Sequence, residues 1–362
     1  MVSLGILVTN LQQEEDYFTT MAKVGLSENV DVFLFLPTDL DPINKRVRGK
    51  KFCHETSSWQ VDSFSLPLFI YDRCFYENEE IFKHNYPNVS WLKAQPDVTF
   101  LGHGLPNKWL VHNALINDPL IGHFLPDTEL LIQANSAFSM FQRHSSLLLK
   151  PVSGSQGKGI FILTDLDNSY LLTAKKNGES FQKILSKKQV EQLLNKISAK
   201  RKYLIQPFLQ LTNNEERPFD LRVFLQRDKF GQWMEIGRGI RTGKIGEYTS
   251  NLGSGGEISS YAEWLQMLPL DAWQPLQQDI ATLIERIPKV LENHGQQLFE
   301  IGFDFGFDHN GKLWLLEVNS KPGRKVITTC FPQKKRNSSK STNPLLSLFR
   351  STKKRVRALE IR

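Results

Sequence analysis

The residues best placed to do chemistry lie in the segment 299–324, which reads FEIGFDFGFDHNGKLWLLEVNSKPGR. Apolar side chains alternate with other residues from Phe299 to Phe307, which is the period of a β-strand. The dipeptide Asn310-Gly311 then predicts a hairpin turn, because both residues tolerate a positive φ angle. A second strand is expected over 312–320.

Pairing across this hairpin brings oxygen-bearing side chains to one face. A two-residue loop places Asp304 opposite Glu317 and Gly302 opposite Asn319; a four-residue loop keeps these faces, and a three-residue loop does not. Two carboxylates with Cβ atoms about 5 Å apart repel each other. Mg²⁺ removes the conflict, because it takes hard oxygen ligands together with water and substrate phosphates. We therefore predict a metal site at Asp304, Glu317 and Asn319, with Gly302 and Gly306 leaving room for a ligand.

The alternative is a solvated hairpin face that carries ordinary acidic residues. Glu317, however, lies within the stretch 313–318, which is otherwise apolar. Such a run is typical of buried strands, where an unpaired glutamate is rare. We favour the metal site for this reason.

The composition indicates a globular protein with an acidic body and a basic end. The chain of 362 residues is 40% hydrophobic and 11% aromatic, which is enough for two or three domains with real cores. Its formal charge is +7, and residues 321–362 hold thirteen Lys or Arg and one Glu. Those residues contribute +12, so residues 1–320 carry −5. The basicity is a property of the C-terminal tail.

Several classes of protein are not indicated. No apolar run reaches the roughly 18 residues of a membrane span, and the N-terminus lacks the basic region of a signal peptide, so we expect a protein that is cytoplasmic when made. Cys53, Cys74 and Cys330 lie far apart without CxxC spacing. We predict free thiols, with neither a disulfide framework nor a zinc site.

Strand and helix patterns alternate in residues 1–100, which predicts an α/β domain. Strands are expected over 4–8, 32–36 and 69–72, and helices over 14–24 and 77–85. The basic segment 45–51 is interpreted as a solvated loop, with contact to an anionic substrate as the alternative. Glycine and proline over 96–107 indicate a domain boundary, after which helices are expected over 109–116 and 130–141.

A lysine-ended strand followed by a glycine-rich loop is the second candidate for chemistry. The segment 147–151 reads as a buried strand containing Lys150, and a lysine there needs an anionic partner. The loop 152–159, VSGSQGKG, leads to a strand over 160–163, and its backbone N–H groups could cradle phosphates. It is not a Walker A loop, because Val152 and Gly159 stand where that motif requires glycine and Ser or Thr.

The next segments add a hinge, arginines and a long loop. A helix is expected from Ser186, followed by strands over 203–209, 219–226 and 233–240. The first strand runs into Pro207, and the backbone groups left unpaired there suit an adenine edge or an ordinary sheet edge. In the second strand, alternation places Asp220 and Arg222 on the face opposite the apolar residues. The glycine-rich loop 242–257 is either disordered or a lid, and we favour the lid; an amphipathic helix is expected over 271–294.

Taken in order, residues from about 105 to 324 resemble an ATP-grasp domain, and the whole chain resembles the YheC/YheD family of spore-coat-associated proteins of spore-forming bacteria. The motifs that carry the resemblance are KPVSGSQGKGIF, YLIQPFL, RPFDLRVFLQRD, GRGIRTG, SNLGSGG and FDFGFDHNGKLWLLEVNSKPG. The resemblance implies an α/β (α+β) ATP-grasp fold over 105–330, an N-terminal α/β pre-ATP-grasp domain over 1–100, and a basic C-terminal tail over 331–362.

The resemblance also implies roles for individual residues. The ATP-binding residues would be Lys108, Lys150, Ser153, Gly154, Ser155, Gly157, Lys158, Gly159, Gln206, Pro207 and Phe208. The residues facing the γ-phosphate and the acceptor would be Arg222, Arg238 and Arg241, with Asn251 in the lid. Mg²⁺, or Mn²⁺ in its place, would be held by Asp304, Glu317 and Asn319. The Gln206-Pro207 hinge departs from the acidic hinge common in this superfamily.

The function that the resemblance implies is that of an ATP- and Mg-dependent carboxylate-amine ligase. Such an enzyme phosphorylates a carboxylate to an acylphosphate, which an amine then attacks. Positioning and charge stabilisation supply most of this catalysis, so no nucleophilic side chain is needed. Two alternatives stay open: phosphotransfer to a hydroxyl, and a non-catalytic ATP-binding role in assembly of the spore coat.

The basic tail bears on the last alternative. Two basic clusters, 334–336 and 353–355, flank the apolar stretch 344–349. This pattern suits docking on spore-coat proteins or another anionic surface, with deposition at the coat, whereas nucleic acid is not an expected partner. We favour the simpler interpretation of a solvated end whose apolar residues pack on the core. No motif names the carboxylate, the amine or the oligomeric state.

Overall fold

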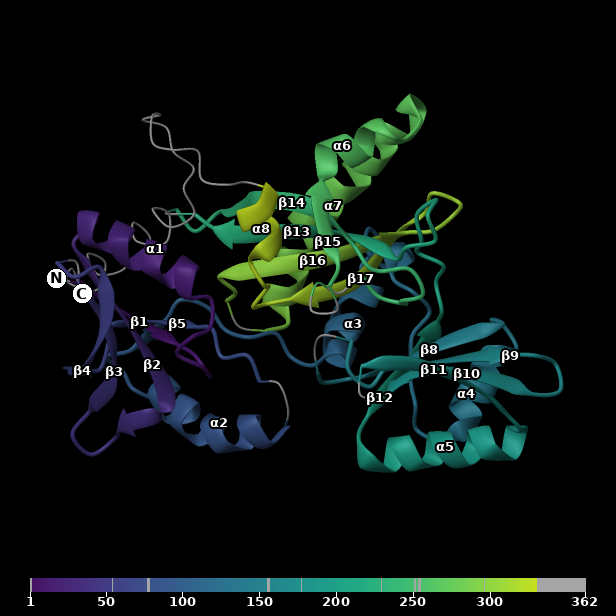
Figure 1. Cartoon of the computed structure of the whole chain (residues 1–362), viewed down its shortest axis with the longest axis horizontal. Coiled ribbons are helices and arrows are strands. Elements are labelled where there is room, and N and C mark those ends of the chain that lie inside the picture. The colour runs from purple at the N-terminus through teal and green to yellow at the C-terminus, as the bar shows by residue number, and fades with distance from the viewer. Residues whose placement is uncertain are drawn as a thin grey trace.

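The structure of the chain is a computed structural model, and it describes residues 2–53, 55–76, 79–154, 157–176, 178–228, 230–250, 252, 255–295 and 297–330. The predictions for Ser155, Asn251 and the basic tail lie outside these residues. Three β-sheets with their covering helices make up the described part. In Figure 1 the first sheet lies at the left, the third in the centre and the second at the lower right. None of the described helices combines the length and apolar character that a membrane crossing requires.

The first sheet arises from the alternating strands and helices of the N-terminal part. Its elements are β1 (Val2–Leu7), α1 (Glu15–Ser27), β2 (Val30–Asp41), β3 (Arg46–Cys53), β4 (Ser58–Ser65), β5 (Phe69–Asp72), α2 (Glu79–Lys93) and β6 (Thr99–Phe100). The strand order is β4-β3-β2-β1-β5-β6, and β2, β1, β5 and β6 are parallel. The basic segment 45–51 is therefore mostly strand and not a loop, because Val47 and Phe52 reach hydrophobic cores on opposite faces.

The second sheet is antiparallel and carries the glycine-rich loop. Its elements are β7 (Glu129–Leu130), α4 (Ala134–Phe141), β8 (Ser146–Pro151), β9 (Phe161–Asp165), β10 (Tyr170–Lys176), β11 (Glu179–Leu185), α5 (Lys187–Lys200) and β12 (Tyr203–Pro207). The order is β11-β10-β9-β8-β12-β7. Helix α5 begins after Ser186, which forms a capping box with Gln189. The helix expected over 130–141 begins only at Ala134, because Leu130 pairs with Leu204 in the sheet.

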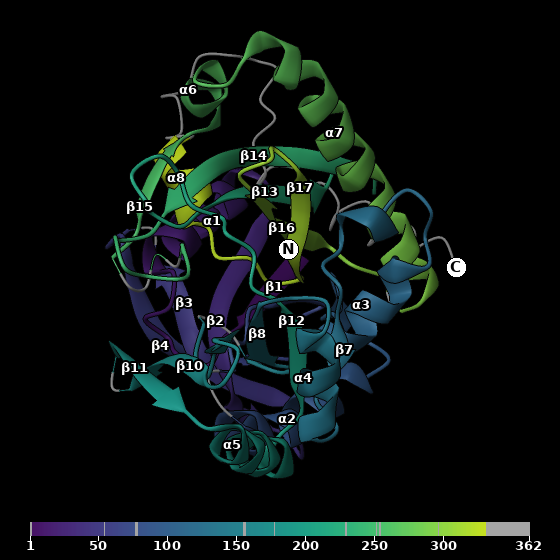
Figure 2. The same cartoon turned by 90° about the vertical axis from the view of Figure 1, so that its right-hand side faces the viewer.

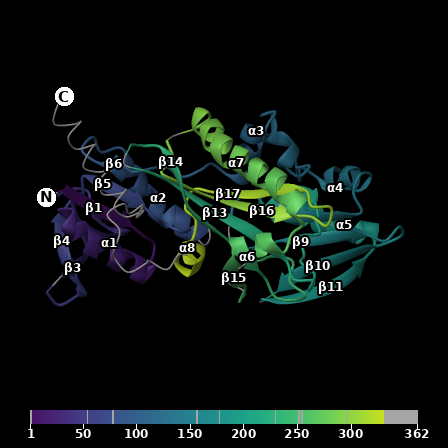
Figure 3. The same ribbon diagram turned by 90° about the horizontal axis from the view of Figure 1, so that it is seen from above.

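The third sheet contains the hairpin that is predicted to bind the metal. Its elements are β13 (Phe219–Arg227), β14 (Trp233–Thr242), β15 (Glu257–Ser260), α6 (Tyr261–Gln266), α7 (Leu270–Asn293), β16 (Glu300–Phe307), β17 (Leu313–Asn319) and α8 (Lys325–Cys330). The strand order is β15-β14-β13-β16-β17. Helix α7 covers one face (Figures 2 and 3), where Ile280 and Leu283 share a core with Val223, Phe303 and Phe305.

Two further elements link the sheets. Helix α3 (Lys108–Ile116) and the short helix η1 (Gly122–Phe124) lie between β6 and β7 in the chain, and Val111 and Leu115 of α3 join the core beneath α7. Phe299, directly before β16, instead packs into the core of the first sheet together with Leu101. All three cysteines are free thiols, as predicted.

The loop of the β16–β17 hairpin differs from the prediction. Phe307 pairs with Leu313, and the backbone N–H of Asp308 donates to the Lys312 carbonyl at 3.1 Å, so the loop has an odd number of residues. Gly311 adopts a φ of 76°, which favours glycine. The loop is therefore neither the two-residue nor the four-residue form on which the predicted pairing depends.

A β-bulge in β17 restores the predicted pairing. Leu316 is an extra residue in the ladder, and beyond it the register shifts by one. Asp304 consequently lies opposite Glu317, and Gly302 lies opposite Asn319, as predicted. The three predicted metal ligands share one face through two irregularities that compensate each other.

Candidate functional site

A chain of buried ion pairs crosses the third sheet on the face opposite to α7. Arg222 on β13 binds both carboxylate oxygens of Asp304 on β16, with Nη2 at 2.9 Å from Oδ2. Arg241 on β14 makes two bonds of 2.6 Å to Asp220 and reaches Oδ2 of Asp304 at 3.1 Å. Arg222 pairs across the strands with Asp304, and Asp220 with Arg241, so all four side chains lie on one face.

The two guanidinium groups set the charge state of the two carboxylates. Burial alone would raise the pKa of Asp304, but Arg222 and Arg241 outweigh burial and hold this pKa below its ordinary value. Burial raises the pKa of Asp220, although Arg241 opposes this effect. Asp220 also accepts a hydrogen bond from the hydroxyl of Ser250. Asp304 is therefore ionised at neutral pH.

Two lysines meet the same hairpin from the second sheet and from α3. Lys150 at the end of β8 donates to the carbonyl oxygen of Leu316 at 3.3 Å, so the bulged residue supplies its acceptor. Burial lowers the pKa of Lys150 to about 8, although Glu317 opposes the shift. Lys108, in the first turn of α3, lies 3.4 Å from Glu317 and donates to the carbonyl of Gly154 at 2.6 Å.

Both lysines line a cleft between α3, β12 and β17. Its empty volume, counted to the open mouth, is about 490 Å³. Its polar side chains are Lys108, His112, Lys150, Gln206 and Glu317, and the remaining lining is apolar. A mostly apolar cleft with a few convergent polar groups is the usual form of a site for a small organic ligand.

The amide of Gln206 has a fixed orientation in this cleft. The hydroxyl of Thr128 donates its proton to the Pro126 carbonyl at 2.7 Å, so its oxygen accepts from Nε2 of Gln206, also at 2.7 Å. The amide oxygen of Gln206 is then the atom that can accept a bond from a ligand. The exocyclic amino group of adenine is a donor of this kind. Pro207 and Phe208, at the end of β12, are not among the described residues that line the cleft.

The glycine-rich loop is described in part, at 152–154 and 157–159. Gly154, Gly157 and Gly159 have φ angles of 130°, 69° and 76°, a backbone region that side-chain-bearing residues rarely adopt. Ser153 and Lys158 are exposed. Gly154 is linked to the cleft by its bond from Lys108.

Arg238 does not join the arginines next to Asp304. It pairs across the sheet with Val223, so its side chain lies on the opposite face of β14 from Arg241. There its Nε donates to Glu235 at 2.6 Å, and its guanidinium lies 5.0 Å from the ring centre of Tyr261. The expectation that Arg238 faces the phosphates is wrong, because two residues three positions apart on one strand point to opposite faces.

The space above Gly302 and Gly306 is filled by the protein's own side chains. A Cβ atom at Gly302 would lie 2.5 Å from Cβ of Pro322, and one at Gly306 would lie 2.7 Å from Cδ1 of Leu211. The expectation that these glycines leave room for a ligand is wrong. Their role is close packing of neighbouring chain.

The donor set of Asp304, Glu317 and Asn319 fits a hard cation that brings other ligands with it. Within the described ranges, no group of three His, Cys, Asp or Glu side chains is arranged to hold a metal alone. The two arginines use three of the roughly four acceptor positions of Asp304, which leaves one for a metal. Mg²⁺ commonly takes one or two carboxylates and completes its shell with water and substrate phosphates.

Three groups of this site, Asp220, Thr128 and the Leu316 carbonyl, have no role predicted from the sequence. Asp220 is placed on the correct face, and its spacing from Arg222 could have indicated a second ion pair. Thr128 and the Leu316 carbonyl carry no local signal, because the pairing of β7 with β12 and a β-bulge bring them into place.

Comparison with known proteins places the chain among similar sequences and folds. A family model described as "YheC/D like ATP-grasp" matches residues 97–346. Endospore coat-associated protein YheC of Bacillus subtilis (strain 168) is 30% identical over 343 residues, which is 92% of each chain. Endospore coat-associated protein YheD of the same organism is 26% identical over 291 residues, 76% of this chain and 61% of YheD. The structure of D-alanyl-alanine synthetase A from Vibrio cholerae shares the fold, with a TM-score of 0.54, 12% identity and 98% of both chains covered.

Proposed function

Because this chain belongs to the YheC/D-like ATP-grasp family, we propose that it is an ATP- and Mg-dependent enzyme of the carboxylate-amine ligase type. The observation that carries the proposal is an excess of positive charge around the cleft and the hairpin. Four cations, Lys108, Lys150, Arg222 and Arg241, accompany three carboxylates, Asp220, Asp304 and Glu317. A partly buried site with an unbalanced positive charge favours an anionic ligand, and nucleotide phosphates supply that charge.

The residues of the cleft would divide the work of holding ATP. Gln206 would accept a hydrogen bond from the adenine amino group. Lys108 and Lys150 would bind the phosphates, Lys108 by exchanging its bond to the Gly154 carbonyl for a phosphate oxygen. Arg222 and Arg241 would act mainly through Asp304, since they keep that carboxylate ionised and fixed in direction.

Asp304, Glu317 and Asn319 would hold Mg²⁺ together with the nucleotide, and the bound ion would neutralise charge that develops on the transferred phosphoryl group. The γ-phosphoryl group would pass to a carboxylate oxygen of the first substrate, which gives an acylphosphate and ADP. An amine would then form the amide bond and release phosphate. Positioning by the lysines and by the two arginines is the contribution of the chain to these steps.

We propose the spore coat as the place of action, with the protein made in the cytoplasm. The support is the name of the relatives YheC and YheD, which are endospore coat-associated proteins. The carboxylate and the amine would then be components that meet the protein during coat assembly.

A non-catalytic nucleotide-binding role is the second candidate, and one observation favours it. Asp304 already has two guanidinium partners, so its charge is compensated before any metal binds. A nucleotide site in which the charge of Asp304 is already compensated would suit a role in coat assembly without turnover of a substrate. Phosphotransfer to a hydroxyl would use the same groups and would end at the phosphorylated product.

Calorimetric titration with ATP, with and without Mg²⁺, tests the proposal. We expect Mg-dependent binding by the wild type that is lost or weakened when Glu317→Gln and Asp304→Asn are combined. Absence of ATP binding by the wild type would refute the proposal. Phosphate release with mixtures of carboxylates and amines then separates the candidates, because ligation frees phosphate, kinase action transfers it, and a non-catalytic protein does neither.

A further inference from the structure

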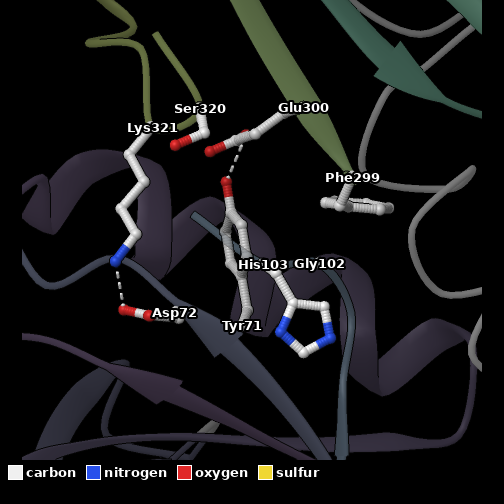
Figure 4. A pocket seen from close by; sticks show the side chains of 8 residues that line it. All are labelled: Tyr71, Asp72, Gly102, His103, Phe299, Glu300, Ser320 and Lys321. Atoms are coloured by element: carbon white, nitrogen blue, oxygen red, sulfur yellow. Dashed lines mark hydrogen bonds and ion pairs between the residues drawn. The ribbon is translucent and has the colours of Figure 1, made fainter. Parts of the chain in front are cut away.

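The five residues that follow the candidate metal ligand Asn319, residues 320–324 (SKPGR), form a segment that we call the anchor segment. The hydroxyl of Ser320 accepts a bond from the backbone N–H of Leu105 at 2.9 Å. Nζ of Lys321 donates to Asp72 at 2.6 Å, as Figure 4 shows. The anchor segment is therefore bound to Leu105, shortly before α3, and to Asp72 of the first sheet.

The same segment lies on strand β16. Pro322 packs where Gly302 has no side chain, so the anchor segment approaches the backbone of β16 between Glu300 and Asp304. The carbonyl of Pro322 accepts a bond from Nη2 of Arg73 at 3.1 Å. The segment after β17 and the strand that carries Asp304 are therefore in direct contact.

Two arginines hold Glu300 at the start of β16. Nη2 of Arg324 donates to Oε2 of Glu300 at 2.7 Å and to the hydroxyl of Tyr71 at 2.6 Å, and Nη1 of Arg73 donates to Oε1 of Glu300. The hydroxyl of Tyr71 donates to Glu300 at 2.7 Å (Figure 4), while Nη2 of Arg73 binds Glu14 at 2.8 Å. Arg73, Glu300 and Arg324 are 0%, 3% and 5% exposed. We call these five side chains the arginine clamp.

The clamp occupies a place where parallel sheets usually bind ligands. The chain passes from β1 to β2 on one side, while β5 lies on the other, and ligands bind outside the carboxyl ends of strands at such a switch point. Arg73 follows β5 there, and its N–H donates to the carbonyl of Leu7 at the end of β1 at 2.8 Å. In this protein, Arg73 binds Glu300 of β16 at the place where such sheets usually bind a ligand. Counted as room for the centres of water molecules, the hollow that remains beside Tyr71 and Asp72 (Figure 4) holds about 10 Å³ and the cleft about 60 Å³.

The charges of the clamp balance, unlike those around the cleft. Arg73 and Arg324 face Glu14 and Glu300, so no ligand is needed to compensate a buried charge. The positions of Glu300 and Arg324 in the chain indicate what the clamp does. Glu300 precedes Asp304 by four residues, which is two strand periods, so both lie on the same face of β16, and Arg324 follows Asn319 within the anchor segment.

We propose that Arg73 and Arg324 are positioning residues, which hold Asp304 and Asn319 at the separation that a shared Mg-nucleotide ligand requires. The inference rests on the proposed function. Glu300 fixes the start of β16, the anchor segment fixes the chain after β17, and Pro322 packed on Gly302 joins the two. Through the clamp, the first sheet acts on the nucleotide site without touching the nucleotide.

The test compares two charge-balanced double variants. The clamp variant combines Glu300→Gln with Arg324→Met, which removes one charge of each sign. The control combines Arg238→Met with Glu235→Gln, which removes a pair with a nitrogen–oxygen distance of 2.6 Å on β14, on the face away from Asp304. For each protein the measurements are the Tm, the Mg²⁺ midpoint for ATP binding by calorimetry, and amide hydrogen exchange along β16 without nucleotide.

We expect both variants to fold with a lowered Tm. Only the clamp variant should raise the Mg²⁺ midpoint, by about tenfold, which is the size of effect that outer-shell partners have on metal sites, and only it should exchange faster around Asp304. A midpoint and an exchange rate equal to those of the control would overturn the proposal. If the clamp variant does not fold, Arg324→Lys keeps the charge but loses the planar guanidinium whose Nη2 reaches both Glu300 and Tyr71, and an unchanged midpoint in that variant is equally decisive. A wild type without Mg-dependent ATP binding contradicts the proposed function, while the exchange measurement still decides whether the clamp holds β16.

Discussion

Nζ of Lys150 lies 3.3 Å from the carbonyl oxygen of Leu316, the residue that the β-bulge adds to β17. One irregularity in a strand thus does two things. It restores the pairing of Asp304 with Glu317, and it presents an acceptor to a lysine of the second sheet. The contact joins the two sheets at the cleft where we propose that phosphates bind.

The affinity for ATP should fall as the pH rises through about 8. The pKa of Lys150 is lowered to about 8, so the ammonium is present below that pH and is lost above it. Binding of an anion above pH 8 must then restore the proton, and the affinity falls by up to about tenfold per pH unit. Calorimetric titrations between pH 6.5 and 9.5 measure this profile. The Lys150→Arg variant stays charged throughout, so its profile should be flat in this range, and a wild-type profile as flat as that of the variant would contradict the assignment.

Discrimination between ATP and GTP should depend on Thr128 as well as on Gln206. The Thr128→Val change removes the acceptor that fixes the Gln206 amide, so the amide can turn its nitrogen toward the base. We expect the ratio of GTP to ATP dissociation constants to fall by about tenfold, the value of roughly one hydrogen bond. Gln206→Glu retains an acceptor and should keep the preference for ATP. An unchanged ratio in Thr128→Val would show that Gln206 does not read the base.

Arg241 and Arg238 should behave differently although they lie close together on β14. Arg241→Lys loses the two-pronged contact with Asp220 and weakens the hold on Asp304, so we expect weaker Mg-dependent ATP binding by about tenfold. Arg238→Lys changes only the opposite face and should leave binding within about twofold of the wild type. Equal losses in both variants, measured by calorimetry at the same Mg²⁺ concentration, would contradict the placement of the two faces.

Gly302→Ala should destabilise the protein by about 2 kcal/mol, because its Cβ would overlap Pro322. Thermal unfolding, or chemical unfolding where heating is irreversible, measures the change. Gly104→Ala is the control, since the nearest atom to its Cβ would be Oγ of Ser320 at 3.8 Å, an ordinary contact. A Gly302→Ala protein as stable as the control would mean that the anchor segment can move away from β16 without cost.

Strand patterns with a strict period were predictable from the sequence. The alternation in β16 and β13 gives the correct faces for Asp304, Arg222 and Asp220. The same rule, applied to β14, separates Arg238 from Arg241, since their positions differ by an odd number. The pairing of Asp304 with Glu317 is predicted correctly although the loop is not. An odd-numbered loop and a one-residue bulge cancel, and neither has a strong local signature.

Contacts between distant segments could not be predicted in this way. Arg73, Glu300 and Arg324 are charged residues, which are rarely buried, and only the completed fold brings them together. The glycines of β16 predict space above the strand, but the local sequence does not identify the residues that fill this space. Pro322 and Leu211 occupy that space, and they lie in other parts of the sequence.

Phe299, which packs into the core of the first sheet, has a practical consequence for anyone who wishes to isolate the ATP-grasp part. A fragment of residues 105–330 would expose this phenylalanine to water and would leave Glu300 without Arg73 and Tyr71. Such a fragment combines an exposed apolar ring with an incompletely paired carboxylate, which favours aggregation over folding. The first sheet is therefore a partner in folding for the ATP-grasp part, and truncation from the N-terminus is expected to remove solubility before it reveals anything about catalysis.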